Sequence, residues 1–377
     1  MINRQRISDE FARQAAIASP SFKEGGMAAY LHERLVRMGA AVEFDRTGPL
    51  IGSESGNLIA RFPGSKQGAP FMLSGHMDTV TPAEGVEPVL ENGVFRSKGE
   101  TILGADDKAG LSEIIEAIEV LKEQRIAHVP LEVVITVCEE IGLLGAKHLD
   151  FGTLQAKWGV ALDTCGIDRA INRAPAANRM IIKVFGHEAH AGVAPETGIS
   201  AIQVVSKAIA RMPLGRIDAE TTANIGVIEG GLAANIIPKQ VTLKAEVRSH
   251  NPEKLRLQTE RMLKCLEEEV DAATIVLDGK PVHAALALEI NDDYPAMQVP
   301  PDAPILKLFK EAGAALRRPL EIAAAGGGSD ANIFNQNGIE TVILGSGMEN
   351  VHSVNEEVSV EDMVKVTELL VEMIRRA

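Results

Sequence analysis

The chain has 377 residues, of which 45% are hydrophobic and 24% are charged, a composition typical of a folded globular protein. This length exceeds the size at which a single hydrophobic core stops growing, so we expect two domains. Asp and Glu outnumber Lys and Arg by 52 to 38, which gives a net charge of −14. A field of that sign repels phosphate, and it therefore argues against nucleic acid and anionic membranes as partners.

The N-terminal sequence MINRQRISDEF is charged and lacks the apolar core of a signal peptide. No apolar run approaches the length of a membrane span. These two features predict a cytoplasmic protein with no membrane partner. Three cysteines cannot all pair, and their spacing is not that of a zinc knuckle.

The first part of the chain alternates predicted helices with apolar strands. Residues 7–40 repeat apolar side chains at intervals of three and four, which predicts one or two helices. Strands are predicted at 57–62, 71–73, 131–137 and 158–162, and the clearest helix runs from 107 to about 124. Strands that alternate with helices predict a largely parallel sheet with helices on both faces.

The pattern changes after residue 173. The next predicted elements are a strand at 180–185, a helix at 200–211, strands at 222–228 and 240–248, a helix at 252–269 and a strand at 284–290. This β-α-β-β-α-β order predicts a small separate sheet with two helices on one face. A helix at 304–316 and a strand at 341–344 then resume the first pattern. We therefore expect an α/β domain formed by residues 1–174 and 294–377, with a domain inserted at 175–293.

Acidic and histidine side chains follow the ends of the apolar strands or stand in a glycine-flanked turn. They are His76 and Asp78 in HMD, Asp106 in GADDKAG, Glu139 and Glu140 in CEEIG, Asp163 in ALD, and His352 in ENVHS. Ligands bind at the carboxyl ends of the strands in open parallel sheets, so we expect these side chains to lie close together.

Imidazole and carboxylate ligands together suit divalent metals such as zinc, cobalt or manganese. One metal needs three or four ligands, so five candidates with a bridging carboxylate suit a site for two metals. Any one of these residues alone is more often a helix cap or a satisfied polar group, and only their joint occurrence indicates a hydrolytic metal site. HEAH at 187–190 has the wrong spacing for the zincin motif, and GGSDA lacks the last glycine of a serine-hydrolase elbow.

In HMDTV, GADDKAG, CEEIG, ALD and HS the sequence resembles the M20 family of co-catalytic zinc peptidases, and most of all its peptidase-T-like branch. The resemblance covers nearly the whole chain. It implies a phosphorylase/hydrolase-like mixed sheet flanked by helices, with an inserted α+β ferredoxin-like lid domain. It also implies two zinc ions, with cobalt or manganese as alternatives.

The resemblance implies a role for each motif residue. His76, Asp106, Glu140, Asp163 and His352 are the implied ligands, with Asp106 bridging the two metals and Asp163 on the same ion as His76. A cis peptide Asp106–Asp107 is implied as well. The catalytic pair is Glu139, the general base that activates a metal-bridging hydroxide, and Asp78, which supports the site without ligation.

The resemblance also implies substrate-binding residues in the inserted domain and the glycine loop. His190 in HEAHAG corresponds to a histidine that stabilises the oxyanion or binds the substrate carboxylate, and in dimeric members this histidine can come from the partner subunit. Asn235 and Arg248 correspond to residues that bind the substrate carboxylate. The loop GGGSDAN supplies Gly327, Gly328 and Ser329. Read without the resemblance, these residues are a surface histidine, solvated polar side chains and a turn.

The function implied is hydrolysis of an amide bond in a small peptide, with a peptidase-T-like tripeptide aminopeptidase as the first expectation. Two departures from peptidase T leave the substrate open: Cys138 stands where that branch usually has Asp, and the stretch from Asp78 to Asp106 is shorter. The alternatives are an N-acyl amino-acid deacylase, a carboxypeptidase or dipeptidase, and, more remotely, a non-catalytic binding protein. A homodimer formed through the lid domain is a further expectation.

Overall fold

The computed structural model describes residues 1–377 and divides the chain into two compact units. Unit 1 comprises Met1–Ala174, Met297–Ala325 and Ser329–Ala377. Unit 2 comprises Pro175–Ala296 and the three glycines Gly326–Gly328. The chain therefore leaves unit 1 twice, once for a long insertion and once for a short glycine loop.

The helices of unit 1 are α1 (Arg4–Ala15), α2 (Gly25–Arg37), α3 (Thr47–Ile51), α4 (Ala105–Glu123), α5 (Leu144–Lys147), η1 (Phe151–Thr153), α8 (Pro304–Leu316), α9 (Asp330–Gln336) and α10 (Val360–Arg376). The helical pattern predicted over 7–40 is two helices. They are separated by residues 16–24, which include Pro20, a residue that disfavours helix at and before its position. This intervening segment reaches the candidate site described below.

The central sheet of unit 1 is mixed, as predicted. Its strands are β1 (Ala41–Phe44), β2 (Leu58–Phe62), β3 (Phe71–His76), β6 (Leu131–Thr136), β7 (Trp158–Thr164), β8 (Arg169–Ala174), β18 (Met297–Gln298), β19 (Glu321–Ala324) and β20 (Glu340–Gly345). Their order is β1-β2-β6-β3-β7-β20-β8-β18, with β19 beside β8. Strands β6, β3, β7 and β20 run parallel to their neighbours in this group, so their carboxyl ends share one edge.

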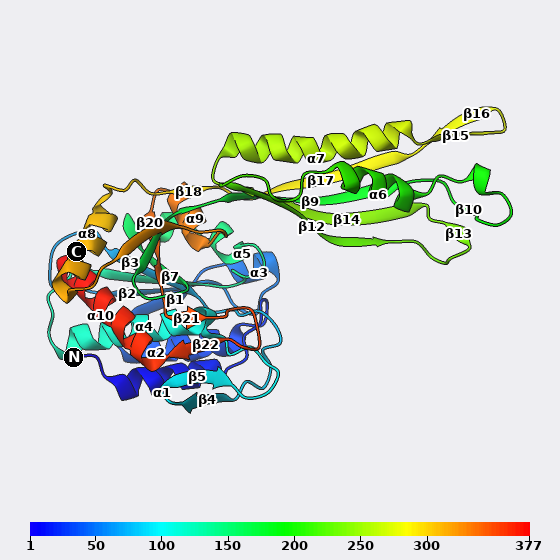
Figure 1. Cartoon of the computed structure of the whole chain (residues 1–377). Helices are drawn as coiled ribbons and strands as arrows, with labels where there is room; N and C mark the ends of the chain where they lie inside the picture. The colour runs from blue at the N-terminus through cyan, green and yellow to red at the C-terminus, as the bar shows by residue number, and fades with distance from the viewer. The chain divides into compact units, whose positions relative to one another are not determined.

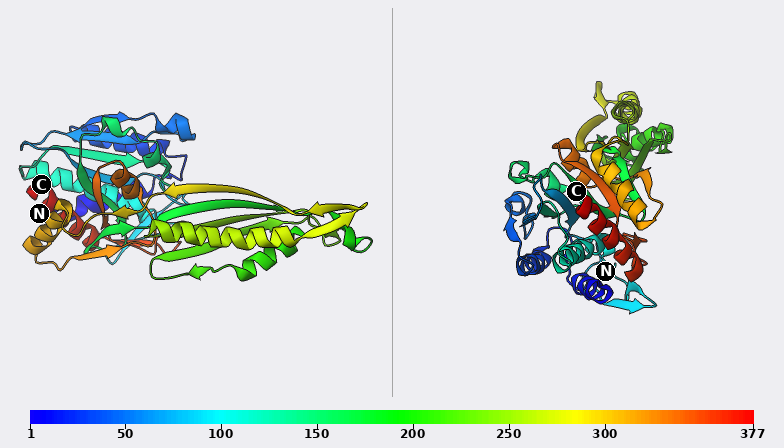
Figure 2. Two further views of the ribbon diagram at one scale, coloured as in Figure 1. Left: turned by 90° about the horizontal axis from the view of Figure 1, so that it is seen from above. Right: turned by 90° about the vertical axis from the view of Figure 1, so that its left-hand side faces the viewer.

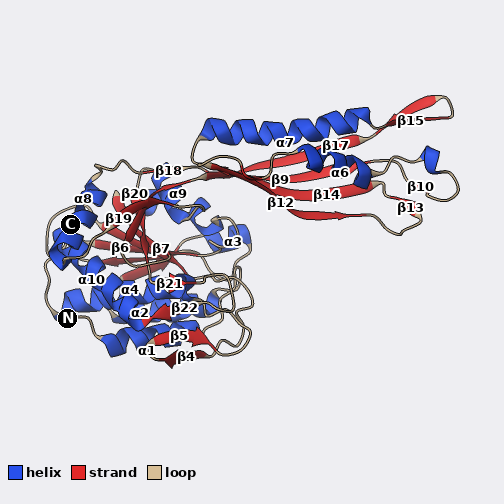
Figure 3. Cartoon of the chain, viewed as in Figure 1, coloured by secondary structure: helices blue, strands red, loops and turns tan.

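Helices cover both faces of the central sheet, as Figure 3 shows. Successive side chains of a strand enter different cores, because strand side chains alternate between faces. In β2, Leu58 and Ala60 join the core that includes α2, α4, α8 and α10, whereas Ile59 joins Met72 and Phe334 of α9 on the other face. Burial on both faces explains the continuous apolar runs of the parallel strands.

A second, antiparallel sheet in unit 1 has the order β21-β22-β5-β4. Its strands are β4 (Pro88–Glu91), β5 (Val94–Ser97), β21 (Met348–Glu349) and β22 (Glu357–Ser359). Phe95 of β5 packs against Phe11 of α1, with 4.9 Å between the ring centroids. The loop that carries His352 connects β21 to β22, so this small sheet fixes both ends of that loop.

Unit 2 is built on an antiparallel sheet with the order β11-β12-β14-β9-β17. Its elements are β9 (Ala176–Phe185), β10 (Ala189–His190), η2 (Pro195–Thr197), α6 (Ala201–Arg211), β11 (Gly215–Arg216), β12 (Thr221–Gly230), β13 (Ile236–Ile237), β14 (Gln240–Ser249), α7 (Pro252–Ala272), β15 (Thr274–Leu277), β16 (Lys280–His283) and β17 (Ala285–Tyr294). The long elements follow the predicted β-α-β-β-α-β order, and α7 runs along the sheet (Figures 1 and 2). One apolar core joins α6 and α7 to β9 and β14.

The close approach of β3 and β7 requires a residue without a side chain at position 159. A Cβ on Gly159 would lie 2.4 Å from the carbonyl oxygen of Met72 and 2.5 Å from its Cβ. We expect Gly159→Ala to lower the free energy of unfolding by about 1–3 kcal/mol, because buried strands cannot separate without loss of packing. Denaturant-induced unfolding measures this change.

Gly26→Ala is the matched control in the same unit. Gly26 lies in α2, and its nearest neighbour to an added Cβ is Ile17 Cγ2 at 3.6 Å, an ordinary contact. Alanine favours helix over glycine, so this variant should gain about 0.5–1 kcal/mol. Equal stability of the two variants would contradict the close approach of the strands.

Candidate metal centre

The parallel strands β6, β3 and β7 deliver acidic and histidine residues to one edge of the sheet. His76 is the last residue of β3 and lies opposite Thr136, the last residue of β6. Glu139 and Glu140 follow β6, and Asp163 lies near the end of β7. The strands run further than predicted, because β3 continues to His76 and β7 to Thr164.

Asp106 stands between two imidazoles. Its Oδ1 lies 3.1 Å from His76 Nε2, and its Oδ2 lies 3.2 Å from His352 Nε2. The Asp106–Asp107 peptide bond is cis, as the resemblance implies, and Asp106 has non-helical dihedral angles near the start of α4. Each carboxylate oxygen of Asp106 therefore faces a different histidine.

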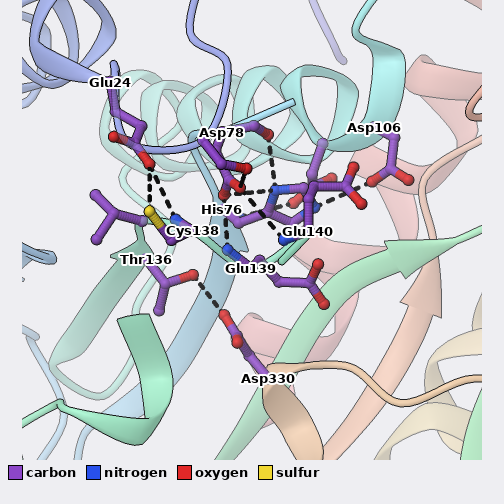
Figure 4. Close-up of polar contacts among 12 residues, drawn as sticks. Glu24, His76, Asp78, Asp106, Thr136, Cys138, Glu139, Glu140 and Asp330 are labelled. Atoms are coloured by element: carbon purple, nitrogen blue, oxygen red, sulfur yellow. Dashed lines mark hydrogen bonds and ion pairs between the residues drawn. The ribbon is translucent and has the colours of Figure 1, made fainter. Parts of the chain in front are cut away.

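Glu140 and Asp163 complete the cluster from opposite sides. Glu140 Oε2 lies 3.0 Å from His352 Nε2, whereas Asp163 Oδ1 lies 3.9 Å from His76 Nε2. Ligand atoms of His76, Asp106 and Glu140 all lie within 4.8 Å of one another. The structure thus brings together all five residues that the sequence predicts as metal ligands (Figure 4 labels three of them).

Asp78 lies beside His76 on its Nδ1 side, with 3.5 Å between Asp78 Oδ1 and His76 Nδ1. It is fully buried, and it accepts hydrogen bonds from the backbone N–H groups of Glu139 at 2.9 Å and Glu140 at 3.2 Å. Its carbonyl oxygen lies 2.9 Å from His76 Nδ1. A carbonyl oxygen can only accept, so His76 Nδ1 carries a proton, and Nε2 is the ring nitrogen that faces Asp106 and is available to bind a metal.

Two further buried carboxylates support the site, and sequence reasoning did not identify them. Glu356 accepts hydrogen bonds from the backbone N–H groups of Leu103 at 2.9 Å, Gly104 at 2.7 Å and Asp106 at 3.0 Å. Asp330, at the start of α9, accepts a hydrogen bond from the Thr136 hydroxyl. Glu356 follows His352 by four residues in HSVNEE, but its charge gives no signal of the backbone groups that it meets.

The electrostatics of the cluster favour a bound cation. Burial and the charge of Asp106 raise the pKa of Asp163 to about 8. Burial, followed by the charge of Asp163, raises the pKa of Glu139 well above its ordinary value. Hydrogen bonds that His352 donates to the carboxylates of Asp106 and Glu140 raise its pKa to about 10. A divalent metal would replace the protons that these groups otherwise hold, so the donor set fits a metal site.

Unit 2 carries the other predicted residues at two separate places. Exposed His190 lies on β10, opposite Ile236 of β13, and the backbone oxygen of Asn235 accepts from Ala191 at 2.9 Å. Half-buried Arg248 lies near the C-terminal end of β14. Its Nε and Nη2 each lie 3.0 Å from a Glu246 carboxylate oxygen. The structure therefore groups His190 with Asn235 but not with Arg248.

The glycine loop packs against side chains of unit 2. A Cβ on Gly328 would lie 2.3 Å from the Tyr294 ring, and the Gly328 N–H donates to the Tyr294 hydroxyl at 3.2 Å. A Cβ on Gly327 would lie 3.4 Å from Arg248 Nη1. Ser329 is buried at the N-cap of α9, where its N–H donates to the Asn332 side chain at 3.1 Å.

The amino-acid sequence matches the profile of peptidase family M20/M25/M40 over residues 72–376. The chain belongs to this family. The Bacillus subtilis protein YqjE is 43% identical over 378 residues, which is 100% of each chain. These matches confirm the resemblance drawn from the motifs, and the protein is a peptidase.

Solved structures of similar proteins confirm the fold class and the peptidase-T-like branch. The crystal structure of aminopeptidase PepT from Bacillus cereus ATCC 10987 has a TM-score of 0.89 at 40% identity, covering 99% of this chain and 98% of that one. A tripeptidase from Staphylococcus aureus Mu50 has a TM-score of 0.93 at 35% identity, covering 100% and 99%. None of the helices of this peptidase is long and apolar enough to cross a membrane.

The raised pKa values predict how the metal-free protein responds to pH. Folded protein retains protons on Asp163 up to about pH 8 and on His352 up to about pH 10, whereas the ordinary pKa values are 3.8 and 6.5. The stability that these groups contribute is present below the ordinary values and is lost as pH rises through the raised ones. The thermal unfolding midpoint of chelator-treated protein should therefore fall from pH 6 to pH 9.

The double variant Asp163→Asn/His352→Ala is the control for this pH dependence. Neither substituted side chain titrates in this range, so its unfolding midpoint should change less between the two pH values. A midpoint that rises with pH in the metal-free wild-type protein would contradict the raised pKa values.

Proposed function

We propose that this M20 peptidase is a di-metal tripeptide aminopeptidase. The observation that carries the proposal is Asp106, whose two oxygens face His76 and His352 separately. A carboxylate so placed suits a bridge between two metals, with His76 and Asp163 on one side and Glu140 and His352 on the other. The mixture of nitrogen and oxygen ligands suits zinc, and cobalt or manganese as alternatives.

When bound, the metals supply Lewis-acid polarisation of the scissile carbonyl and lower the pKa of the attacking water. Glu139 is the proton carrier in this proposal. Its carboxylate accepts the proton of the water and donates it to the nitrogen of the leaving amine. Its buried environment supports this role, because burial favours the protonated form and so brings its proton affinity closer to that of the groups with which it exchanges.

Asp78 determines where Glu139 and Glu140 point. Glu139 and Glu140 lie after β6, in a turn closed by hydrogen bonds from the backbone N–H groups of Gly142 and Leu143 to the Glu139 carbonyl oxygen. Asp78 binds both of their backbone N–H groups, at 2.9 and 3.2 Å. In this proposal Glu140 faces the metals while Glu139 faces the water.

The similar aminopeptidase and tripeptidase support a short peptide with a free amino group as the substrate. The identities of 40% and 35% extend over almost the whole of each chain. An N-acyl amino-acid deacylase would instead accept a blocked amine, and a dipeptidase would prefer two residues to three. Comparing cleavage of free tripeptides, free dipeptides and N-acetylated tripeptides distinguishes these reactions.

We expect Glu139→Gln to lower kcat for a free tripeptide by about 10²–10⁴-fold, because the glutamine amide has nearly the same shape as the carboxylate but cannot accept the proton of the water. Its metal content should equal that of the wild type, since Glu139 is not a ligand in this proposal. Release of the N-terminal amino acid measures turnover, and elemental analysis measures the metal.

Asp106→Asn is the control for this experiment, because it should lose metal together with activity. Retained activity in Glu139→Gln would contradict the role of Glu139. A wild-type protein that cleaves the N-acetylated tripeptide faster than the free one would contradict the aminopeptidase assignment.

We further propose that His190 and Arg248 bind the substrate of one active site from different subunits of a dimer. Arg248 lies opposite Ala177 of β9. Phe185 is eight residues farther along β9, so about 26 Å separates it from Ala177, and His190 follows Phe185 in the chain beyond that end of the strand. An extended tripeptide spans only about 11 Å. One tripeptide therefore cannot contact both His190 and Arg248 of the same unit 2. In a dimer, it could contact Arg248 of one subunit and His190 of the other.

Mixed dimers test this division between subunits. We expect Glu139→Gln and His190→Ala to be inactive alone and to regain activity when they are co-refolded or co-expressed. A mixed dimer would hold one site with both native residues, because His190 comes from the other chain. Activity of the mixture that stays at the level of the separate variants would contradict a partner-supplied His190.

A further inference from the structure

A buried carboxylate outside the predicted site holds the turn that precedes the catalytic pair. Glu24 is fully buried in the segment between α1 and α2, and its Oε1 accepts from the Cys138 backbone N–H at 3.0 Å and the Cys138 thiol at 3.0 Å. Phe22 N–H donates to the same oxygen at 3.0 Å, and the Ser53 hydroxyl donates to Oε2 at 2.7 Å. Figure 4 shows Glu24 directed at Cys138.

Glu24 and Asp78 together bind three consecutive backbone N–H groups. Glu24 takes that of Cys138, and Asp78 takes those of Glu139 and Glu140. The segment before α2, which carries Glu24, also contacts Asp78, because the Ser21 hydroxyl donates to the Asp78 carboxylate at 2.7 Å. The whole backbone of the CEE sequence is thus fixed by buried acceptors.

The backbone conformation at Cys138 needs such support. Cys138 has a φ of 52°, in the left-handed region that residues with a Cβ seldom adopt. Conformations of this kind persist when surrounding interactions determine them. The left-handed residue turns the chain out of β6, and the following residues are Glu139 and Glu140.

The chemical match between the two side chains is specific. A carboxylate only accepts hydrogen bonds, so its neighbour must donate. Cys138 Sγ lies 3.0 Å from Glu24 Oε1, so the thiol is the donor in this hydrogen bond and the carboxylate is the acceptor. An acidic residue at position 138 would instead place a second carboxylate against Glu24.

We propose that Glu24 is a positioning residue that fixes the left-handed turn at Cys138 and thereby directs the carboxylate of Glu139 toward the reacting water. This inference rests on the proposed role of Glu139. Glu24 itself touches neither substrate nor metal ligands, and it acts only through the backbone and thiol of Cys138. The competing interpretation is that Glu24 contributes to stability alone.

Glu24→Ala should lower kcat for a free tripeptide by about 10–100-fold, because a small displacement of the proton acceptor is enough for such a loss. KM and metal content should stay at the wild-type values, since the ligands and substrate residues are unchanged. Glu24→Gln should retain most of the activity, because its amide oxygen still accepts from the Cys138 N–H and thiol.

A compensating pair tests the donor–acceptor match independently of the alanine variant. Cys138→Asp should lose kcat, although Asp tolerates left-handed backbone better than most residues. Adding Glu24→Gln to Cys138→Asp should restore a large part of kcat, because the glutamine amide can donate to the new carboxylate. A purely structural Glu24 predicts no such recovery.

Glu10→Gln is the matched control for a buried carboxylate that is distant in sequence from CEE. Glu10 accepts from the Tyr30 hydroxyl at 2.6 Å and from Arg34 Nε at 2.9 Å. This variant should lower the thermal unfolding midpoint and leave kcat unchanged. The contrast separates loss of stability from loss of positioning.

Three outcomes would overturn the inference. They are a folded Glu24→Ala with wild-type kcat, a loss of kcat in Glu24→Ala that is matched by Glu10→Gln, and a double variant no more active than Cys138→Asp. If the wild-type protein cleaves tripeptides, such results refute the role of Glu24 alone. An inactive metal-loaded wild type would overturn the proposed function, and this inference with it.

Discussion

Repulsion between carboxylates at the carboxyl edge of β3, β6 and β7 is the constraint on which the site depends. Parallel strands bring His76, Glu139, Glu140 and Asp163 to one edge, and the start of α4 adds Asp106. Burial raises the pKa of Glu139, Glu140 and Asp163, so their charged forms are unfavourable without compensation. Two imidazoles offset part of this charge, and a cation is the group that would offset the rest.

A second set of buried carboxylates accepts hydrogen bonds from backbone N–H groups and does not point into the predicted metal site. Glu24, Asp78 and Glu356 accept from backbone nitrogens at 2.7–3.2 Å. N–H groups that donate to a carboxylate favour its anion without a cationic partner, and at Glu356 they offset part of the effect of burial, which raises its pKa. Some acids thus hold the backbone in place, whereas others face the metal site. Because the backbone is held, the repelling carboxylates of the cluster cannot move apart.

The sequence predicts the acids that face the cluster because each follows an apolar strand or a glycine turn. Of the acids that face the backbone, it predicts Asp78 but not Glu24 or Glu356. Glu24 meets Cys138 across 114 residues, and Glu356 meets Leu103 across 253. Such contacts depend on how loops fold over the sheet edge, and a local pattern carries no information about this. Strand ends were predicted short at His76 and Asp163 for a related reason, since polar residues that finish a buried strand resemble the start of a loop.

The arrangement of Arg248 bears on its proposed role in binding the substrate carboxylate. Glu246 binds the Nε and Nη2 side of the guanidinium, so Nη1 is left toward Gly327. A substrate carboxylate would therefore meet a guanidinium that is already oriented and partly neutralised, rather than a freely rotating cation. Tyr294 fixes the adjacent Gly328, where any side chain would collide with its ring. In the proposed substrate-binding role, Arg248 would thus offer a preoriented donor beside a glycine backbone, an arrangement that suits a terminal carboxylate.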